Sequence, residues 1–270
     1  MTDRRAAFRN LHRPGRPLLL PNAWDHASAA ALAAAGFPAV GTTSLGVAAA
    51  HGLPDGAAAT RAQNLTLARL LAPLPVLLTV DVEAGFGHDP AEVADYVAEL
   101  ADLGVVGVNI EDGRADGDLA PVEVTAAKVA AVKAAVPGLF VNARTDAWWL
   151  GVADPLEQAL GRGRAYLSAG ADGIFTPGVT DPGPVRVLVA ELPAPLNLLY
   201  RPGGPDLAEF GRLGVARVST GSLLFRAALG AVLDVATTVR DGAAPALPDV
   251  PSYARVQALS AGGGNRPSLG

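Results

Sequence analysis

The chain has 270 residues, of which 50% are hydrophobic and 17% are charged, and it contains no cysteine. This composition suits a folded globular core and excludes a disordered or collagen-like chain. The formal net charge is −5, so there is no basic field to hold nucleic acid or an anionic membrane. The lack of cysteine excludes a disulfide scaffold, thiolate metal ligands and a thiol nucleophile.

The first long apolar stretch, residues 27–50, has no charged residue and is long enough to raise the question of a membrane span. Gly36, Pro38 and Gly41 divide it into a short helix, a strand and a loop. The only apolar run nearer the N-terminus, residues 18–20, is too short for the core of a signal peptide. We therefore expect a cytoplasmic protein with no membrane partner.

Eight short runs rich in Val, Leu and Ile alternate with helical segments along the chain. We predict strands over residues 18–22, 39–43, 76–80, 105–110, 139–143, 173–176, 196–200 and 216–219. Helix start signals lie between them, such as Thr60 followed three residues later by Gln63, which matches a capping box. After the last strand we expect a helix over residues 223–239, a Pro-rich connector, and one or two helical turns over residues 253–260.

Eight parallel strand-helix units predict a single (β/α)8 TIM barrel over residues 1–242. Residues 243–270 form a short Pro/Gly-rich C-terminal extension. Its last part, with Gly262, Gly263 and Gly264, cannot build a core, and we expect it to be mobile or docked on a neighbouring subunit. An open, doubly wound sheet is the alternative arrangement of the same elements.

The active site of such a barrel lies at the carboxyl ends of its strands. The polar residues found there are Asn22, Asp25, Thr43, Ser44, Asp81, Glu83, Glu111, Asp112, Arg144, Asp146, Thr176, Arg201, Ser219 and Thr220. Asp81 and Glu83 share a side of their strand, and Glu111 and Asp112 come from the next strand, so several carboxylates should converge. Like charges so close repel unless a cation holds them. Oxygen ligands without Cys or His favour Mg²⁺ or Mn²⁺.

A structural role for these residues is the alternative interpretation. Each acid could cap a following helix or brace a loop, and Arg144 could pair with Asp146 or Asp112 as a structural partner. The four histidines have no metal-like spacing, and we expect them on surfaces or loops.

Six segments, taken together and in order, resemble the isocitrate lyase/phosphoenolpyruvate mutase superfamily. They are Leu20–Asp25, Gly52–Gly56, Asp81–Gly87, Asn109–Asp112, Asn142–Asp146 and Arg217–Gly221. The resemblance covers about residues 18–235. It implies a barrel enzyme, usually a homotetramer, that uses Mg²⁺ to bind a small 2-oxo or 2-hydroxy acid and makes or breaks a bond next to an enolate.

The resemblance also implies roles for single residues. Asp81 matches a direct metal ligand, and the ligands that act through metal-bound water match Asp55, Glu83 and Glu111. The substrate carboxylate would be held by the loop of Thr43, Ser44 and Leu45. Arg144 matches the arginine that contacts the substrate and its developing negative charge, and Thr176 stands at a further substrate-contact position. The residues expected in catalysis are therefore Arg144, Asp81 and Glu111.

Departures from the superfamily pattern reduce the number of candidate activities. Isocitrate and methylisocitrate lyases carry a Lys-Lys-Cys-Gly-His segment after the fourth strand, but this chain has residues 112–118, Asp-Gly-Arg-Ala-Asp-Gly-Asp, in that place. Phosphorus-carbon chemistry uses a Lys and an Asn in this loop and a His after the sixth strand, where this chain has Thr176. We therefore expect Mg²⁺-dependent carbon-carbon cleavage of a small 2-oxo acid, similar to oxaloacetate decarboxylase, with the loop Asp112–Ala120 as a gate.

Other functions remain open at this point. A retro-aldol lyase of the methylisocitrate lyase type is one, and phosphoenolpyruvate mutase or phosphonopyruvate hydrolase chemistry is another. A third, of a different class, is a barrel that binds a metal and a small acid without catalysis.

Overall fold

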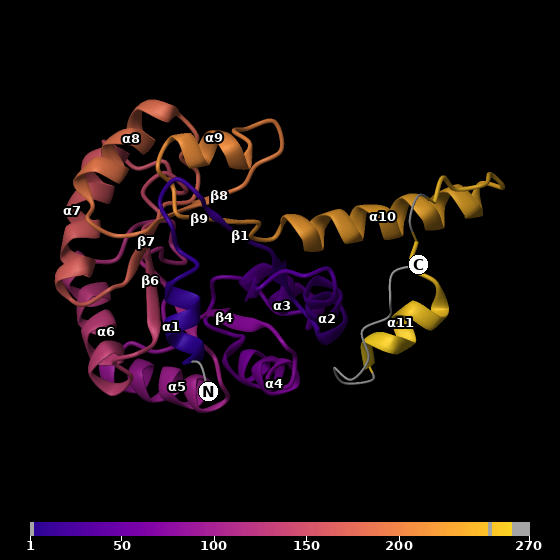
Figure 1. The fold of residues 1–270 in the computed structure, drawn as a ribbon, viewed down its shortest axis with the longest axis horizontal. Helices are drawn as coiled ribbons and strands as arrows, with labels where there is room; N and C mark the ends of the chain where they lie inside the picture. The colour runs from indigo at the N-terminus through magenta and orange to yellow at the C-terminus, as the bar shows by residue number, and fades with distance from the viewer. Residues whose placement is uncertain (1–2, 248–249, 261–270) are drawn as a thin grey trace.

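The computed structural model describes residues 3–247 and 250–260, and within them nine parallel strands form one sheet (Figure 1). They are β1 (Leu18–Leu20), β2 (Asn22–Ala23), β3 (Ala39–Thr42), β4 (Leu77–Asp81), β5 (Gly107–Glu111), β6 (Phe140–Arg144), β7 (Gly173–Phe175), β8 (Leu196–Leu199) and β9 (Arg217–Ser219). β1 and β2 are two halves of one strand, interrupted at Pro21, which has no N–H to donate. β1 pairs with β9 and β2 with β3, so this strand closes the ring.

The closed ring confirms the predicted (β/α)8 TIM barrel and excludes the open, doubly wound sheet. All eight predicted strands are present, the first in two pieces, and their bounds agree with the predicted ones within one or two residues. The division into a barrel over residues 1–242 and an extension over residues 243–270 stays a prediction.

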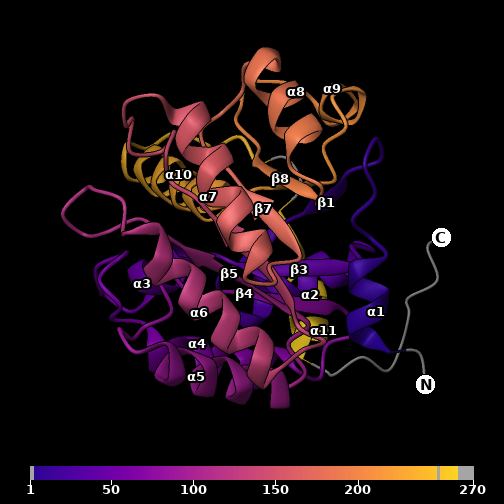
Figure 2. The ribbon, with the colours of Figure 1, turned by 90° about the vertical axis from the view of Figure 1, so that its left-hand side faces the viewer.

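Most of the helices cover the outside of the barrel (Figure 2), and the structure has eleven in its described residues. They are α1 (Arg4–Arg9), α2 (His26–Ala34), α3 (Ser44–Ala50), α4 (Arg61–Leu71), α5 (Pro90–Asp102), α6 (Val122–Ala135), α7 (Pro155–Ser168), α8 (Pro182–Glu191), α9 (Leu207–Arg212), α10 (Leu223–Arg240) and α11 (Tyr253–Ser260). The predicted helices over residues 223–239 and 253–260 are confirmed. In the part of the chain that the structure describes, no helix has the length and apolarity that crossing a membrane requires.

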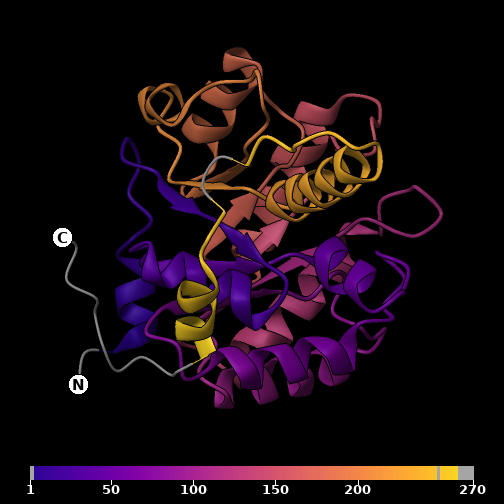
Figure 3. The same ribbon diagram turned by 90° about the vertical axis from the view of Figure 1, so that its right-hand side faces the viewer.

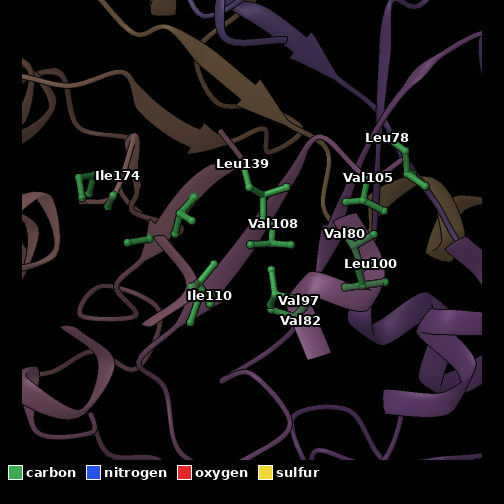
Figure 4. Close-up of a cluster of buried hydrophobic side chains, with 14 of the residues drawn as sticks. Leu78, Val80, Val82, Val97, Leu100, Val105, Val108, Ile110, Leu139 and Ile174 are labelled. Atoms are coloured by element: carbon green, nitrogen blue, oxygen red, sulfur yellow. The ribbon is translucent and has the colours of Figure 1, made fainter. Parts of the chain in front are cut away.

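The main core lies between the strands and the outer helices. Val108 and Ile110 of β5 and Val97 and Leu100 of α5 are fully buried in it (Figure 4). Because successive side chains of a strand point to opposite faces, the residues between these apolar ones point into the barrel. Asn109 of β5 is one of them, and its amide oxygen accepts from Asn142 of β6 at 2.9 Å inside the barrel.

Helix α1, which the sequence analysis did not predict, covers the amino-terminal end of the barrel. Its Phe8 is fully buried in a second apolar cluster with Leu20 and Phe140. His12 stacks on the Phe140 ring with 4.2 Å between centroids, and burial, together with the nearby Arg217, lowers the pKa of His12 to about 3. His12 thus lies in a loop between α1 and β1, as expected for the histidines, but it is buried and not at the surface.

The C-terminal helices leave the barrel. Helix α10 projects away from it (Figure 1), and only Phe225 of this helix is buried. Helix α11 returns to the outside of the barrel (Figure 3), where it contacts α2. The segment 261–270, for which we expected mobility or docking, lies outside the described residues.

Candidate active site

A cavity of about 370 Å³ opens at the carboxyl ends of the strands. Its charged residues come from β4, β5, β6 and the loops after α3, β5 and β6, and they are Asp55, Asp81, Glu111, Arg114, Arg144 and Asp146. Register explains part of this assembly, because Glu111 and Arg144 are paired residues of neighbouring strands. Thr43, Ser44 and Leu45, which the sequence analysis expected to bind substrate, also line the cavity.

Arg144 lies at the centre of the acidic residues. Its Nη1 is 2.7 Å from Oε2 of Glu111, and its Nε donates to Oδ1 of Asp146 at 2.7 Å. Burial alone would lower the pKa of Arg144, but Glu111, Asp146 and Asp81 raise it above its ordinary value. The guanidinium therefore stays charged although most of its surface is buried.

Three carboxyl groups of this site, those of Glu111, Asp81 and Asp146, have raised pKa values. Burial raises the pKa of Glu111 to about 8 although Arg144 acts in the opposite direction. Burial also raises the pKa of Asp81, with Arg144 again opposing and Asp55 adding to the rise. Asp146 shows the same pattern. One buried guanidinium does not compensate this group of acids, so a further cation would be stabilised among them.

The donor set fits Mg²⁺ or Mn²⁺, because these carboxylates are hard oxygen donors. Within residues 3–247 and 250–260, no three or more His, Cys, Asp or Glu side chains stand close enough together to surround one ion. One direct carboxylate ligand, with the other acids reaching the ion through water, does not require such a group, and Mg²⁺ commonly keeps several waters.

Asp81 is held from two sides at the end of β4. Its backbone N–H donates to Oγ1 of Thr42 at 2.9 Å. Backbone N–H groups of Ser44 and Glu83 lie near its carboxylate and lower its pKa, although burial outweighs them. The side chain that the resemblance marks as the direct metal ligand is thus fixed in position at the cavity wall.

Glu83 does not reach the wall. Its backbone is left-handed, with φ of 50°, and its side chain is turned to the loop that follows Asp55. Oε2 accepts from the backbone N–H of Ala58 at 2.9 Å, and Oε1 accepts from Oγ1 of Thr60 at 3.0 Å. The predicted capping box at Thr60 is therefore wrong, because the Thr60 hydroxyl binds Glu83 instead of capping α4.

Asp112 also points away from the cavity, against the expectation that it joins the acidic group. Its Oδ2 accepts from the Tyr166 hydroxyl at 2.7 Å and from Nη1 of Arg162 at 3.1 Å. Arg162 also donates to the carbonyl oxygen of Ala120 at 2.8 Å. Both ends of the loop Asp112–Ala120 are thereby attached to α7, while its middle projects from the barrel (Figures 2 and 3).

Thr176 is fully buried, and it is the residues on either side of it, Phe175 and Pro177, that line the cavity. Sequence reasoning missed both, together with Trp149, Leu150 and Leu199 on the same wall. The available signal was their position near the carboxyl ends of strands: Trp149 and Leu150 in the loop after β6, Phe175 and Pro177 at and after the end of β7, and Leu199 at the end of β8.

Comparison with known proteins supports an enzyme barrel of one particular kind. A model of the phosphoenolpyruvate phosphomutase family matches residues 8–240. A Mycobacterium tuberculosis protein named only as uncharacterized is 45% identical, covering 93% of this chain and 95% of its own length. The 2-methylisocitrate lyase of Bacillus subtilis is 34% identical over 76% of this chain and 67% of its own. The oxaloacetate decarboxylase of Pseudomonas putida is 35% identical over 86% and 83%.

Among solved structures, a phosphonopyruvate hydrolase in complex with oxalate and Mg²⁺ superposes with a TM-score of 0.82. It is 27% identical, and the match covers 96% of this chain and 95% of that one. The fold, the site and these matches define a superfamily of lyases and mutases, whose members are enzymes. The chain belongs to the phosphoenolpyruvate phosphomutase family, within the isocitrate lyase/phosphoenolpyruvate mutase superfamily.

Proposed function

We propose that the protein catalyses Mg²⁺-dependent carbon-carbon bond cleavage of a small 2-oxo acid through an enolate, as an oxaloacetate decarboxylase does. The observation that carries the proposal is the buried group in which Arg144 pairs with Glu111 and Asp146 and lies near enough to Asp81 to be influenced by its charge. This arrangement offers a site for a cation on one side and a fixed guanidinium on the other, and both stabilise an enolate.

Asp81 would hold the ion directly, with Asp55 and Glu111 nearby in the same cavity. Glu83, which the resemblance marks as a further ligand, has both carboxylate oxygens bound to Ala58 and Thr60. We propose that it acts by fixing the loop that carries Asp55. When bound, the ion supplies a Lewis acid for the 2-oxo group of the substrate.

The protein's own groups bind and orient the substrate. Arg144 offers donors to the substrate carboxylate and to the charge that develops on the enolate. The second oxygen of this carboxylate would accept hydrogen bonds from the hydroxyl and backbone N–H groups of Thr43, Ser44 and Leu45. A single fixed donor of this kind is typically worth about 3–4 kcal/mol in the transition state.

Of the reactions considered, decarboxylation needs the fewest acid and base groups from the protein. Carbon dioxide leaves without removal of a hydroxyl proton, whereas retro-aldol release needs a base for that proton and an acid for the carbanion. The chain has no cysteine for the second role. The oxaloacetate decarboxylase among the relatives supports this choice.

A retro-aldol lyase is the second candidate, and the 2-methylisocitrate lyase of Bacillus subtilis favours it. Cleavage of a phosphorus-carbon bond is a third candidate, because the phosphonopyruvate hydrolase has a similar structure. The purified protein should be incubated with Mg²⁺ and, separately, oxaloacetate, phosphonopyruvate, isocitrate and substituted malates, and the products followed by NMR. We expect pyruvate from oxaloacetate; cleavage of only the hydroxy acids would instead select the lyase, and conversion of only phosphonopyruvate the phosphorus-carbon enzyme.

We also propose that the protein works in the cytoplasm as a homo-oligomer, a homotetramer by resemblance. The apolar side chains of α10 support this, because several of them are exposed on a helix that leaves its own barrel, namely Leu229, Val232, Leu233 and Val239. Exposed apolar surface of this kind marks protein interfaces. Light scattering should give the mass of four chains, and a monomer mass at micromolar concentration would contradict the proposal.

A further inference from the structure

The cavity has two unlike walls. The acids and Arg144 lie in β4, β5 and β6 and the loops near them, whereas apolar residues line the part of the cavity next to β7 and β8. Polar residues such as Asn22, Ser219 and Ser222 complete the lining. Five residues at and after the ends of β6, β7 and β8 form what we call the apolar wall, and they are Trp149, Leu150, Phe175, Pro177 and Leu199. The proposed reaction on a small dicarboxylate makes no use of such a wall.

Local packing fixes the apolar wall in place. Gly178 has a φ of +96°, and a Cβ on it would lie 3.2 Å from Cβ of Trp148 and 3.4 Å from the backbone nitrogen of Trp149. A Cβ on Gly221 would lie 2.8 Å from Cδ1 of Leu199. Both glycines therefore allow a close approach that holds Trp149 and Leu199 where they line the cavity.

The two walls meet at Arg144. Its guanidinium carbon is 5.6 Å from the centroid of the Phe175 ring, while its nitrogens contact Glu111 and Asp146. A 2-oxo acid whose carboxylate contacts Arg144 therefore lies beside Phe175, and the apolar wall offers its remaining carbons a surface to pack on. The cavity, at about 370 Å³, lies in the range of sites that take ligands larger than a four-carbon acid.

We propose that the substrate of this enzyme is a 2-oxo acid with an apolar substituent on the carbon next to the oxo group, and that Phe175, Leu199 and Trp149 select it. This inference rests on the proposed function, since it assigns the substrate class of the same site. Burial of each methylene against the apolar wall lowers the dissociation constant about fourfold.

The test uses the 2-oxo acids pyruvate, 2-oxobutyrate, 2-oxopentanoate and 2-oxohexanoate, which differ only in the alkyl chain, with the full-length protein and Mg²⁺ in calorimetry. We expect affinity to rise about fourfold per methylene. In Leu199→Ala the increase in affinity should be twofold or less per methylene. Leu70→Ala, at an exposed position of α4, is the matched control and should keep the wild-type series.

Equal affinity for all four acids, or an identical series in Leu199→Ala and the wild type, would overturn the inference. If oxaloacetate is decarboxylated but the series is flat, the proposed function stands and only the substituent is wrong. If no acid of the series binds and oxaloacetate is not turned over, the proposed function itself fails. A Trp149→Ala variant provides a second check, because Trp149 is exposed and its removal should not unfold the barrel.

Discussion

Substitution of Arg144 by lysine removes an interaction that no single ammonium group can replace. The guanidinium reaches Glu111 through Nη1 and Asp146 through Nε, both at 2.7 Å. A lysine ammonium is a point charge at the end of a flexible chain and does not reproduce a planar set of donors. In Arg144→Lys, at least one of the two carboxylates, or the substrate itself, therefore loses its partner.

The magnitude follows from the hydrogen bonds that the substitution removes. A hydrogen bond to a charged group contributes about 1.5–3 kcal/mol, so the loss of one such bond in the transition state lowers kcat/KM roughly 10- to 150-fold. The same substitution should also destabilise the fold, because the Asp146 side chain is only 4% exposed and an unpaired buried carboxylate is costly.

The assay compares initial rates of oxaloacetate decarboxylation with Mg²⁺, and urea unfolding curves, for Arg144→Lys and a matched control. Arg164→Lys is that control, since Arg164 pairs with Glu191 at the same 2.7 Å but both side chains are 53% exposed. Exposed pairs contribute little, so the control should stay within about twofold in rate. A rate for Arg144→Lys within about twofold of the wild type, or an equal loss in both variants, would refute the reasoning.

Three further predictions concern the metal, the loop and the barrel base. Asp81→Ala should abolish Mg²⁺ binding in calorimetry while far-ultraviolet circular dichroism stays unchanged, and unaltered Mg²⁺ affinity would remove Asp81 from the metal site. Oxalate with Mg²⁺ should slow tryptic cleavage after Arg114 severalfold if the loop Asp112–Ala120 closes over the ligand, whereas an unchanged cleavage rate would contradict gating. His12 has a pKa of about 3 in the folded protein, below its ordinary value of 6.5. As the pH falls, the unfolded chain therefore takes up a proton at His12 before the folded chain does. The free energy of unfolding should be unaffected by His12 above about pH 6.5 and should fall by up to ~1.4 kcal/mol per pH unit between there and pH 3. His12→Gln should flatten that decline in urea unfolding measured between about pH 6.5 and 4, and an unchanged slope would show that His12 is not its source.

The barrel was predictable because each buried parallel strand reads as a short apolar run with its polar residues at the carboxyl end. The positions of Asp81 and Glu111 followed from the same pattern. The orientation of Asp112 was also accessible, since it follows Glu111 directly and successive strand residues face opposite sides; treating both as members of one acidic group overlooked that period.

Other features depend on the path of the chain after a strand ends, which the sequence pattern does not determine. Glu83 turns away from the cavity through a left-handed backbone at a residue other than glycine. Helix α1 covers the barrel with one buried phenylalanine, Phe8, in a segment too polar to show a periodic apolar pattern. The apolar wall was missed because Phe175 and Leu199 are of the residue types that fill the core, and only their position as the last residues of β7 and β8 sets them apart.

The central claim is that this cavity generates an enolate from a 2-oxo acid with the help of Mg²⁺. The most direct measurement is oxaloacetate decarboxylation in D₂O, followed by proton NMR, with Mg²⁺ alone and Mg²⁺ with Asp81→Ala as controls. The account predicts pyruvate carrying at least one deuterium in its methyl group, formed well above the rate of both controls. Formation of pyruvate no faster than with Mg²⁺ alone would contradict it.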